Sequence, residues 1–293
     1  MTSHSLQRFW HKPWTEKLTT AEFLFRQNLA KLPYLPVPIT LKISAEEPVR
    51  FWWSYLPPSY SEELSFFEYW GHDASDLRFL WKTLQPGGTF FDVGAYHGVY
   101  SVIAGKRVTN RGQVVAFEPS PRDRRRLQLH LRWNGICSAQ VEPYAAGAAA
   151  MKTTFFQVVS GDPTRNGLRP PATDDSTARI SVETITLDQY VAERGIGQVD
   201  VMKLDVEGGE LEVLRGAAKM FEKFRPALIC EVLDETTKVW GYQAREIISY
   251  LSATGYQWFE CAADGTLIPH EIREAYPIVK NFVAVPKEKL SRV

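Results

Sequence analysis

The segment at residues 90–102, FFDVGAYHGVYSV, constrains the fold of this chain more than any other. Its apolar start is typical of a short buried strand, which runs into an acid, Asp92, and then into a turn that contains glycine. The apolar positions at 99–104 predict the first turns of a helix. A strand, a turn and a helix in this order are typical of an open α/β sheet, where ligands bind outside the carboxyl ends of the strands. We therefore expect Asp92 to face a small molecule.

A second strand, predicted over residues 113–117, ends at another acid, Glu118. Ser120 and Pro121 follow as an N-cap and a first-turn proline, so a helix is expected next. An acid at the end of the second strand is where nucleotide-binding α/β folds bind ribose hydroxyls. Asp92 and Glu118 together predict a nucleoside ligand.

The glycines near Asp92 indicate which nucleoside is bound. A dinucleotide site needs G-x-G-x-x-G so that the backbone can approach a pyrophosphate, but this turn has only Gly94 and Gly98. S-adenosylmethionine carries an ammonium and a sulfonium group, has no phosphate, and ends in a ribose and an adenine. It suits an acidic turn better than NAD does, and it is the predicted cofactor.

A further pair of acids follows the strand predicted over residues 199–204. Asp205 and Glu207 lie two residues apart on an extended segment, so both side chains are expected to face one cavity. Methyl transfer needs in-line approach of a nucleophile, and a carboxylate that takes the proton of a hydroxyl makes it more reactive. Asp205 and Glu207 are therefore the predicted catalytic residues. The structural alternatives are that Asp205 caps backbone amides, and that Glu207 caps the next helix or pairs with Lys203.

These motifs resemble the FkbM family of S-adenosylmethionine-dependent methyltransferases over about residues 86–233. The resemblance rests on FFDVGAYHGVYSV, VVAFEPSP, RRLQLHLRWNGI, and VMKLDVEGGELEVLRGA followed by PALICEV. It implies a Rossmann-like, seven-stranded, doubly wound sheet and methylation, usually of a hydroxyl on a sugar or secondary metabolite. In the family's first motif an Asn commonly follows Gly-Ala, whereas this chain has Tyr96.

The cofactor is expected to contact the ends of the first three strands of the sheet. Asp92 and Gly94 are assigned to its methionine end, Glu118 to the ribose, and the loop after the third strand to the adenine. The full predicted set is Asp92, Gly94, Ala95, Tyr96, His97, Tyr100, Ser101, Glu118, Pro119, Glu142 and Ala145. No metal site is predicted: Asp205 and Glu231 offer oxygen ligands, but no acid or amide at the next strand end completes the shell, and the family does not require a metal.

Composition limits the remaining classes of function. The 34 Lys and Arg residues balance 34 Asp and Glu residues, so charge does not favour nucleic acid or an acidic membrane as the main partner. The three cysteines are far apart, which disfavours a disulfide framework and a zinc site. No stretch is long and apolar enough to span a bilayer. We expect a cytoplasmic enzyme with a hydroxylated small-molecule acceptor, and a homo-oligomer is left open.

Two regions are predicted along the chain. Residues 1–85 form an accessory region and acceptor lid, with a helix at 16–32, aromatic side chains that fill a small core or line the acceptor pocket, and His72 as a candidate on the acceptor side. Residues 86–293 form the methyltransferase domain. A long loop at 160–177 is expected near the acceptor, with polar side chains that bind substrate or are solvated: Asp162, Arg165, Asn166 and Arg169.

Two other functions remain open at this point. One is methylation of nitrogen or carbon on the same scaffold, because a carboxylate can orient an amine as well as a hydroxyl. The other is a noncatalytic S-adenosylmethionine-binding protein that scaffolds partners through its aromatic N-terminal region. The intact Asp205-Val206-Glu207 segment favours an enzyme.

Overall fold

The computed structural model describes residues 38–42, 48–52 and 74–292. The chain divides into two compact units, residues 1–65 and 66–293. In the smaller unit the structure describes an antiparallel pair, β1 (Pro38–Lys42) and β2 (Pro48–Trp52). The helix expected at 16–32 and His72 lie outside the described residues. The lid function therefore stays a prediction.

Helix α4 (Ala74–Thr83) belongs to the larger unit, although the sequence boundary at residue 85 grouped it with the accessory region. It packs against α5 and approaches β11. The chain then enters the main sheet, so α4 is the first described element of the α/β fold.

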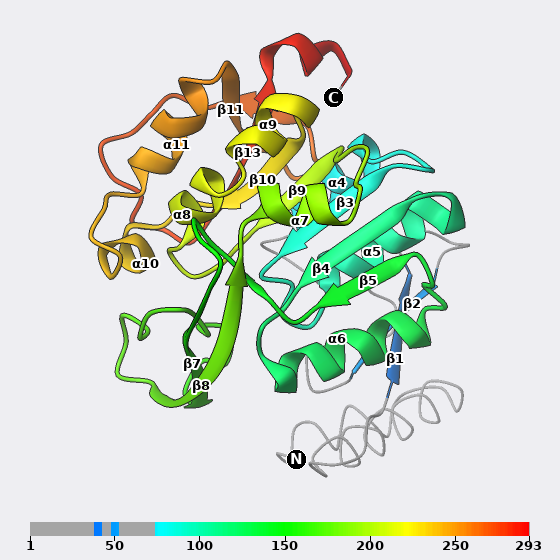
Figure 1. Ribbon diagram of the computed structural model, residues 1–293. Coiled ribbons are helices and arrows are strands. Elements are labelled where there is room, and N and C mark those ends of the chain that lie inside the picture. The colour runs from blue at the N-terminus through cyan, green and yellow to red at the C-terminus, as the bar shows by residue number, and fades with distance from the viewer. Residues whose placement is uncertain (1–37, 43–47, 53–73, 293) are drawn as a thin grey trace, which may run out of the picture. The chain divides into compact units, whose positions relative to one another are not determined.

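An eight-stranded sheet forms the centre of the larger unit, in the order β12-β11-β13-β10-β9-β3-β4-β5 (Figure 1). Strands β5, β4, β3, β9 and β10 pair in parallel, and β13 is antiparallel to its neighbours. The bounds are β3 (Thr89–Val93), β4 (Gln113–Phe117), β5 (Ala139–Glu142), β9 (Val201–Leu204), β10 (Ala227–Glu231), β11 (Tyr256–Cys261), β12 (Leu267–Pro269) and β13 (Asn281–Pro286).

Seven of these strands give the Rossmann-like, doubly wound sheet with an antiparallel edge that the sequence predicts. The eighth, β12, is a three-residue strand beside β11 that the sequence reading missed. A strand this short carries no recognisable alternation of apolar and polar residues, so only its pairing reveals it.

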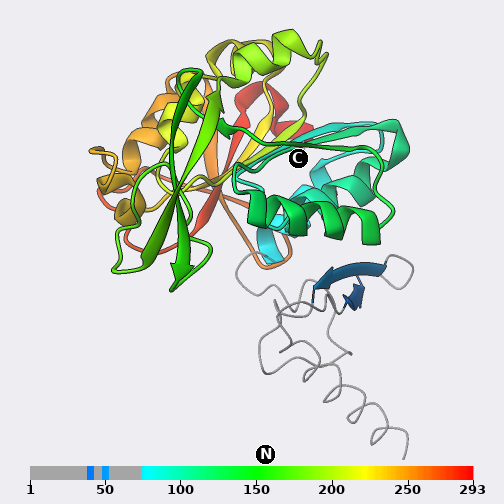
Figure 2. The ribbon, with the colours of Figure 1, turned by 60° about the horizontal axis from the view of Figure 1, so that its bottom comes forward.

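Helices cover both faces of the sheet (Figures 1 and 2). Helices α4, α5 and α6 pack side by side on one face, and α7, α8, α9 and α11 share a core with the other. The alternation of side chains along a strand explains this: Phe91 and Val93 belong to the core with Tyr190 and Leu214, while Asp92 between them points to the opposite face. The bounds are α5 (Val99–Val108), α6 (Pro121–Trp133), α7 (Leu187–Glu193), α8 (Glu210–Arg215), α9 (Ala218–Phe224), α10 (Asp234–Lys238) and α11 (Arg245–Ser252).

A second sheet of three strands lies beside the main one, with the order β6-β8-β7. It consists of β6 (Ala145–Ala146), β7 (Met151–Ser160) and β8 (Ser176–Ile185), and Figure 2 shows β7 and β8 as a long ribbon. Residues 161–175 connect these two strands, and Gly167 in this loop pairs back to Phe156. None of the helices in the described ranges is long and apolar enough to cross a membrane.

Candidate active site

The first turn, after β3, is held close to two neighbouring strands. The Gly94 and Ala95 amides both donate to the Phe117 carbonyl, at 3.1 and 3.0 Å, and the Asp205 amide donates to the Val93 carbonyl at 3.0 Å. Gly94 has φ +82°, and a Cβ atom there would lie 1.8 Å from the Asp205 carbonyl oxygen. Only glycine permits this approach, which brings the cofactor turn and the predicted catalytic segment together.

Substitution of Gly94 should therefore unfold the site. Gly94→Ala is expected to lower the free energy of unfolding by about 2 to 6 kcal/mol, because the backbone strain and the steric clash add. The matched control is Gly135→Ala, since Gly135 also has positive φ, +65°, but no atom lies within 4 Å of its added Cβ. The control should lose only about 1 to 2 kcal/mol. Urea denaturation measures both, and equal losses would contradict the steric account.

Asp92 lies near the end of β3, and its side chain is buried. Its side chain is 2% exposed and accepts a hydrogen bond from Ser101 Oγ at 2.5 Å. It lies opposite Lys203 in the pairing of β3 with β9. Burial raises the pKa of Asp92 to about 6, although the Ser101 hydroxyl and the Lys203 charge lower it. The residue joins β3 to the start of α5 beneath the turn, and its contact with a cofactor stays a prediction.

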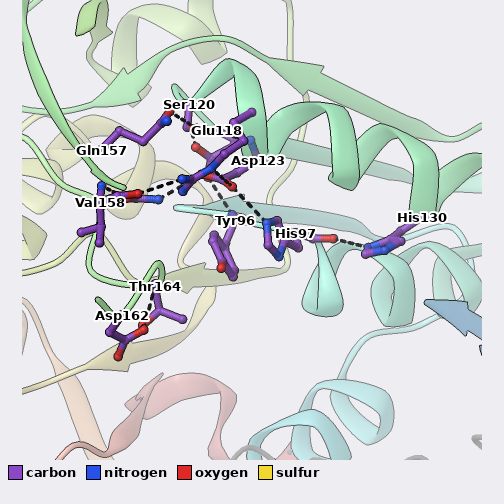
Figure 3. Close-up of polar contacts among 12 residues, drawn as sticks. Tyr96, His97, Glu118, Ser120, Asp123, His130, Gln157, Val158, Asp162 and Thr164 are labelled. Atoms are coloured by element: carbon purple, nitrogen blue, oxygen red, sulfur yellow. Dashed lines mark hydrogen bonds and ion pairs between the residues drawn. The ribbon is translucent and has the colours of Figure 1, made fainter. Parts of the chain in front are cut away.

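Glu118 joins two turns at the end of β4 (Figure 3). Its Oε2 accepts the Tyr96 amide and its Oε1 accepts the Ser120 amide, both at 2.8 Å. The side chain is 4% exposed, and burial raises the pKa of the carboxyl to about 8. A carboxylate has about four lone-pair sites, so each oxygen can accept a further hydrogen bond after the two amides. By this count each Glu118 oxygen has an acceptor site left for a further donor.

Tyr96 adopts the left-handed backbone conformation, with φ +48°. Asn tolerates this conformation better than other side-chain-bearing residues, which gives a physical reason for the Asn that is common here in the family. The Tyr96 ring stacks on the His97 ring with 3.6 Å between centroids. In this strained backbone conformation the Tyr96 amide donates to Glu118 Oε2.

Asp123, in the first turn of α6, was not selected from the sequence but is the centre of a buried network (Figure 3). It accepts hydrogen bonds from His97 Nε2 at 3.0 Å, Arg122 Nε at 2.9 Å and Asn166 Nδ2 at 2.9 Å. Burial lowers the pKa of His97, so the neutral ring donates to Asp123. Asp123 thus fixes the first turn, helix α6 and the long loop against each other. The signal available in the sequence was the acid three residues after the N-cap Ser120.

The loop at 161–175 packs against the protein through the polar side chains that were candidates for substrate binding. Arg165 pairs with Glu235 at 2.7 Å, and the Arg169 guanidinium lies 5.0 Å from the centre of the Trp240 ring. Gly167 brings the loop beside Glu207, because a Cβ on Gly167 would lie 3.3 Å from the Glu207 Cβ. The loop therefore runs over the predicted catalytic segment, and whether its side chains bind an acceptor stays a prediction.

Asp205 lies directly after β9 and is paired with a buried lysine. The Lys203 ammonium, 2% exposed, contacts Asp205 Oδ2 at 3.0 Å and Asn281 Oδ1 at 2.8 Å. The Asp205 side chain itself is 36% exposed. The buried Lys203 ammonium thus holds the Asp205 carboxylate in position. The carboxylate itself is partly exposed and remains accessible to a ligand at the carboxyl edge of the sheet.

Glu207 has positive φ, +57°, and does not cap the following helix. The N-cap of α8 is Gly209, and no side chain caps the helix. Glu210 Oε1 accepts the Val206 amide at 2.9 Å and the Gly208 amide at 3.3 Å, which holds the turn before the helix. The alternative that Glu207 caps the next helix is therefore wrong. Lys203 pairs with Asp205, and the catalytic role of Glu207 stays a prediction. Burial and the neighbouring Asp205 and Glu210 carboxylates raise the pKa of Glu207 well above its usual range, as expected for a group that accepts a proton.

Residues 92–258 match the family model of the methyltransferase FkbM domain, which is more than half of the chain. The chain belongs to the FkbM methyltransferase family. The resemblance drawn from the motifs is confirmed, and the match takes in the first turn, Glu118, the acidic segment at Asp205 and the fold as far as β11.

Three curated relatives align with less than half of this FkbM-family chain. The antimetabolite synthetase AmbE of Pseudomonas aeruginosa is 28% identical over 45% of the chain and 8% of AmbE. The hexuronic acid methyltransferase AglP of Haloferax volcanii is 28% identical over 48% of the chain and 54% of AglP. Methyltransferase sdnD of Sordaria araneosa is 29% identical over 45% of the chain and 61% of sdnD. The chain therefore spans less than two thirds of the length of each.

Among solved structures, a methyltransferase FkbM from Methylobacillus flagellatus superposes with a TM-score of 0.43 at 16% identity. The superposition covers 68% of this chain and 43% of that one. The fold assignment of the FkbM-family chain rests on its own strand order.

The other predicted cofactor residues lie at varying depth in this FkbM-family domain. Tyr100 lies with its ring centre 5.3 Å from the Lys203 ammonium, and Pro119 is buried between Glu118 and the start of α6. Ala145 is buried in β6, parallel to β8. The Glu142 carboxylate accepts the Tyr190 hydroxyl at 3.0 Å, so its side chain is turned toward α7. Contacts of these residues with a cofactor stay predictions.

Proposed function

We propose that this FkbM-family chain is an S-adenosylmethionine-dependent methyltransferase that methylates a hydroxyl of a small molecule, a sugar or a secondary metabolite. The observation that carries the proposal is Glu118, a buried carboxylate at the end of β4 whose oxygens keep lone pairs beside a turn without the pyrophosphate glycines. In this assignment Glu118 accepts the ribose hydroxyls, and the first turn holds the methionine end of the cofactor.

The chemical step needs a proton acceptor beside the methyl group. The acceptor oxygen bonds to the methyl carbon while the carbon–sulfur bond breaks, and the electron pair of that bond stays on sulfur, so S-adenosylhomocysteine leaves. The hydroxyl proton passes to the Asp205 and Glu207 pair, where burial and like charge raise the pKa of Glu207. A positioned base of this kind typically accelerates a reaction by about a hundredfold to ten-thousandfold.

Cofactor binding should release a proton below pH 8. Burial raises the pKa of Glu118 to about 8, so the free protein holds this carboxyl mainly protonated at pH 7. Two ribose hydroxyls that donate to Glu118 favour its ionised form, so cofactor binding lowers the pKa of Glu118. The affinity for the cofactor should therefore rise with pH up to about 8, by up to about tenfold per pH unit. Calorimetry of S-adenosylhomocysteine binding in buffers of different ionisation enthalpy counts the proton. In Glu118→Gln the release should disappear, and its persistence there would assign the proton to another group.

The acceptor can be identified from the transferred methyl group. Because AglP acts on a hexuronic acid, hexuronic acids are the first acceptors to test with S-adenosylmethionine labelled in the methyl group. Label recovered as a methyl ether supports the proposal. Label on nitrogen or carbon would replace the proposed chemistry with the alternative on the same scaffold. Cofactor binding without transfer to any compound in a metabolite extract would favour a noncatalytic role.

A further inference from the structure

Three carboxylates from separate elements converge at the carboxyl edge of the sheet. Asp205 follows β9, Glu210 begins α8, and Glu231 ends β10. One carboxylate oxygen from each lies within 4.8 Å of the others. The parallel pairing of Leu204 with Cys230 places Asp205 and Glu231 side by side at the ends of neighbouring strands. Glu210 was not predicted from the sequence to belong to this cluster, because it lies on a helix and not at a strand end.

Glu231 supplies an independent sign that a ligand belongs here. Its Oε2 atom is buried, and no donor among the described residues reaches it. Buried polar atoms in folded proteins nearly always have a partner, so a buried carboxylate oxygen without one requires an explanation. An ion bound between the three carboxylates would provide it.

The positive charge present does not balance the cluster. In the described ranges, Lys203 is the cation that contacts these acids, and it binds Asp205 Oδ2 and the Asn281 side chain. The Val206 and Gly208 amides both bind Glu210 Oε1. Asp205 and Glu210 therefore each keep a second oxygen, and Glu231 adds its buried one.

We propose that Asp205, Glu210 and Glu231 bind one hard divalent cation, Mg²⁺ or Mn²⁺. An all-oxygen ligand set of carboxylates is the kind that these ions prefer. Mg²⁺–oxygen bonds of about 2.0 to 2.1 Å place ligand oxygens about 3 to 4 Å apart. The three oxygens lie within 4.8 Å of one another, so binding would draw them slightly closer together. Asp205 and Glu231 are partly accessible, so the ion can exchange with solvent and keep an open position.

The role of the cation rests on the proposed function, whereas its binding does not. A hydroxyl of the acceptor in the open position would have its pKa lowered by the ion and would become a better nucleophile. The hydroxyl proton would leave to water at the partly accessible edge of the site. The new carbon–oxygen bond then forms as the carbon–sulfur bond of the cofactor breaks.

Manganese titration of the full chain tests the site without methyl transfer. Electron paramagnetic resonance of Mn²⁺ added to chelator-treated protein should show a single bound ion per chain, and Mg²⁺ should displace it. Glu231→Gln keeps the side-chain shape and should weaken Mn²⁺ affinity by about tenfold or more, the scale seen when one supporting group of a metal site is lost. The matched control is Glu212→Gln, an acid on the same helix, α8, outside the cluster, which should bind Mn²⁺ like the parent.

Circular dichroism and a titration with S-adenosylhomocysteine on the same preparations establish that each variant is folded. Absence of stoichiometric Mn²⁺ binding overturns the proposal, as does an affinity in Glu231→Gln equal to that in Glu212→Gln. If S-adenosylhomocysteine binds and Mn²⁺ does not, the cation site alone is wrong. If Mn²⁺ binds with the expected loss in Glu231→Gln while S-adenosylhomocysteine does not bind, the site stands and the proposed function fails.

Discussion

Asp205→Asn is expected to bind S-adenosylmethionine as tightly as the parent and to transfer its methyl group about a hundredfold to ten-thousandfold more slowly. The side-chain amide of Asn has nearly the shape of the carboxylate. The hydrogen bond from the backbone N–H of residue 205 to the Val93 carbonyl, which fixes the segment, does not depend on the side chain. What is lost is the negative charge beside Lys203, which the proposed function assigns to the acceptor hydroxyl. Single-turnover rates with a true acceptor, together with cofactor titrations, separate the two effects.

Two companion variants complete this experiment. Glu212→Gln removes a charge from α8 outside the cluster and should retain the parent rate. Glu207→Gln tests which carboxylate takes the hydroxyl proton. A larger loss of methyl-transfer rate than in Asp205→Asn would identify Glu207 as the base and Asp205 as the residue that positions the acceptor. A parent-like rate in both Asp205→Asn and Glu207→Gln would move the catalytic site elsewhere on the rim.

Glu118→Ala is expected to weaken cofactor binding by about 1.5 to 3 kcal/mol, or roughly 10- to 150-fold, the scale of hydrogen bonds to a charged group. The substitution also leaves the Tyr96 and Ser120 amides without their acceptor, so the free energy of unfolding should fall as well. Calorimetry well below the unfolding temperature separates affinity from stability. Glu222→Ala, an exposed acid on α9, is the control and should bind the cofactor like the parent. Equal affinities in the two variants would remove Glu118 from the cofactor site.

The strands of the main sheet could be predicted because each is encoded by a short run of neighbouring residues. Each of β3, β4, β9 and β10 is a short apolar run with an acid at or after its end, and parallel strands place such ends at one edge. The positions of Glu118 and Asp205 followed from this pattern alone. The turn at Gly94 was recognisable too, although the reason for the glycine, the approach of the Asp205 carbonyl, is visible only in the structure.

Other features depend on contacts between distant residues. Asp92 was expected to face a ligand, which stays a prediction, and its hydrogen bond with Ser101 and its place opposite Lys203 are visible only in the structure. Nothing in the residues of β7 and β8 indicates that these strands pair in a sheet of their own. The turn before α8 is similar, since only the structure shows that Glu210 accepts the Val206 and Gly208 amides there.

The central claim is that the turn after β3 and Glu118 bind S-adenosylmethionine. Isothermal titration of the full chain with S-adenosylhomocysteine and, separately, with NAD tests it most directly. The account predicts saturable binding of a single S-adenosylhomocysteine and no binding of NAD, because the turn lacks the glycines that a pyrophosphate needs. Tight binding of NAD with none of S-adenosylhomocysteine would contradict it.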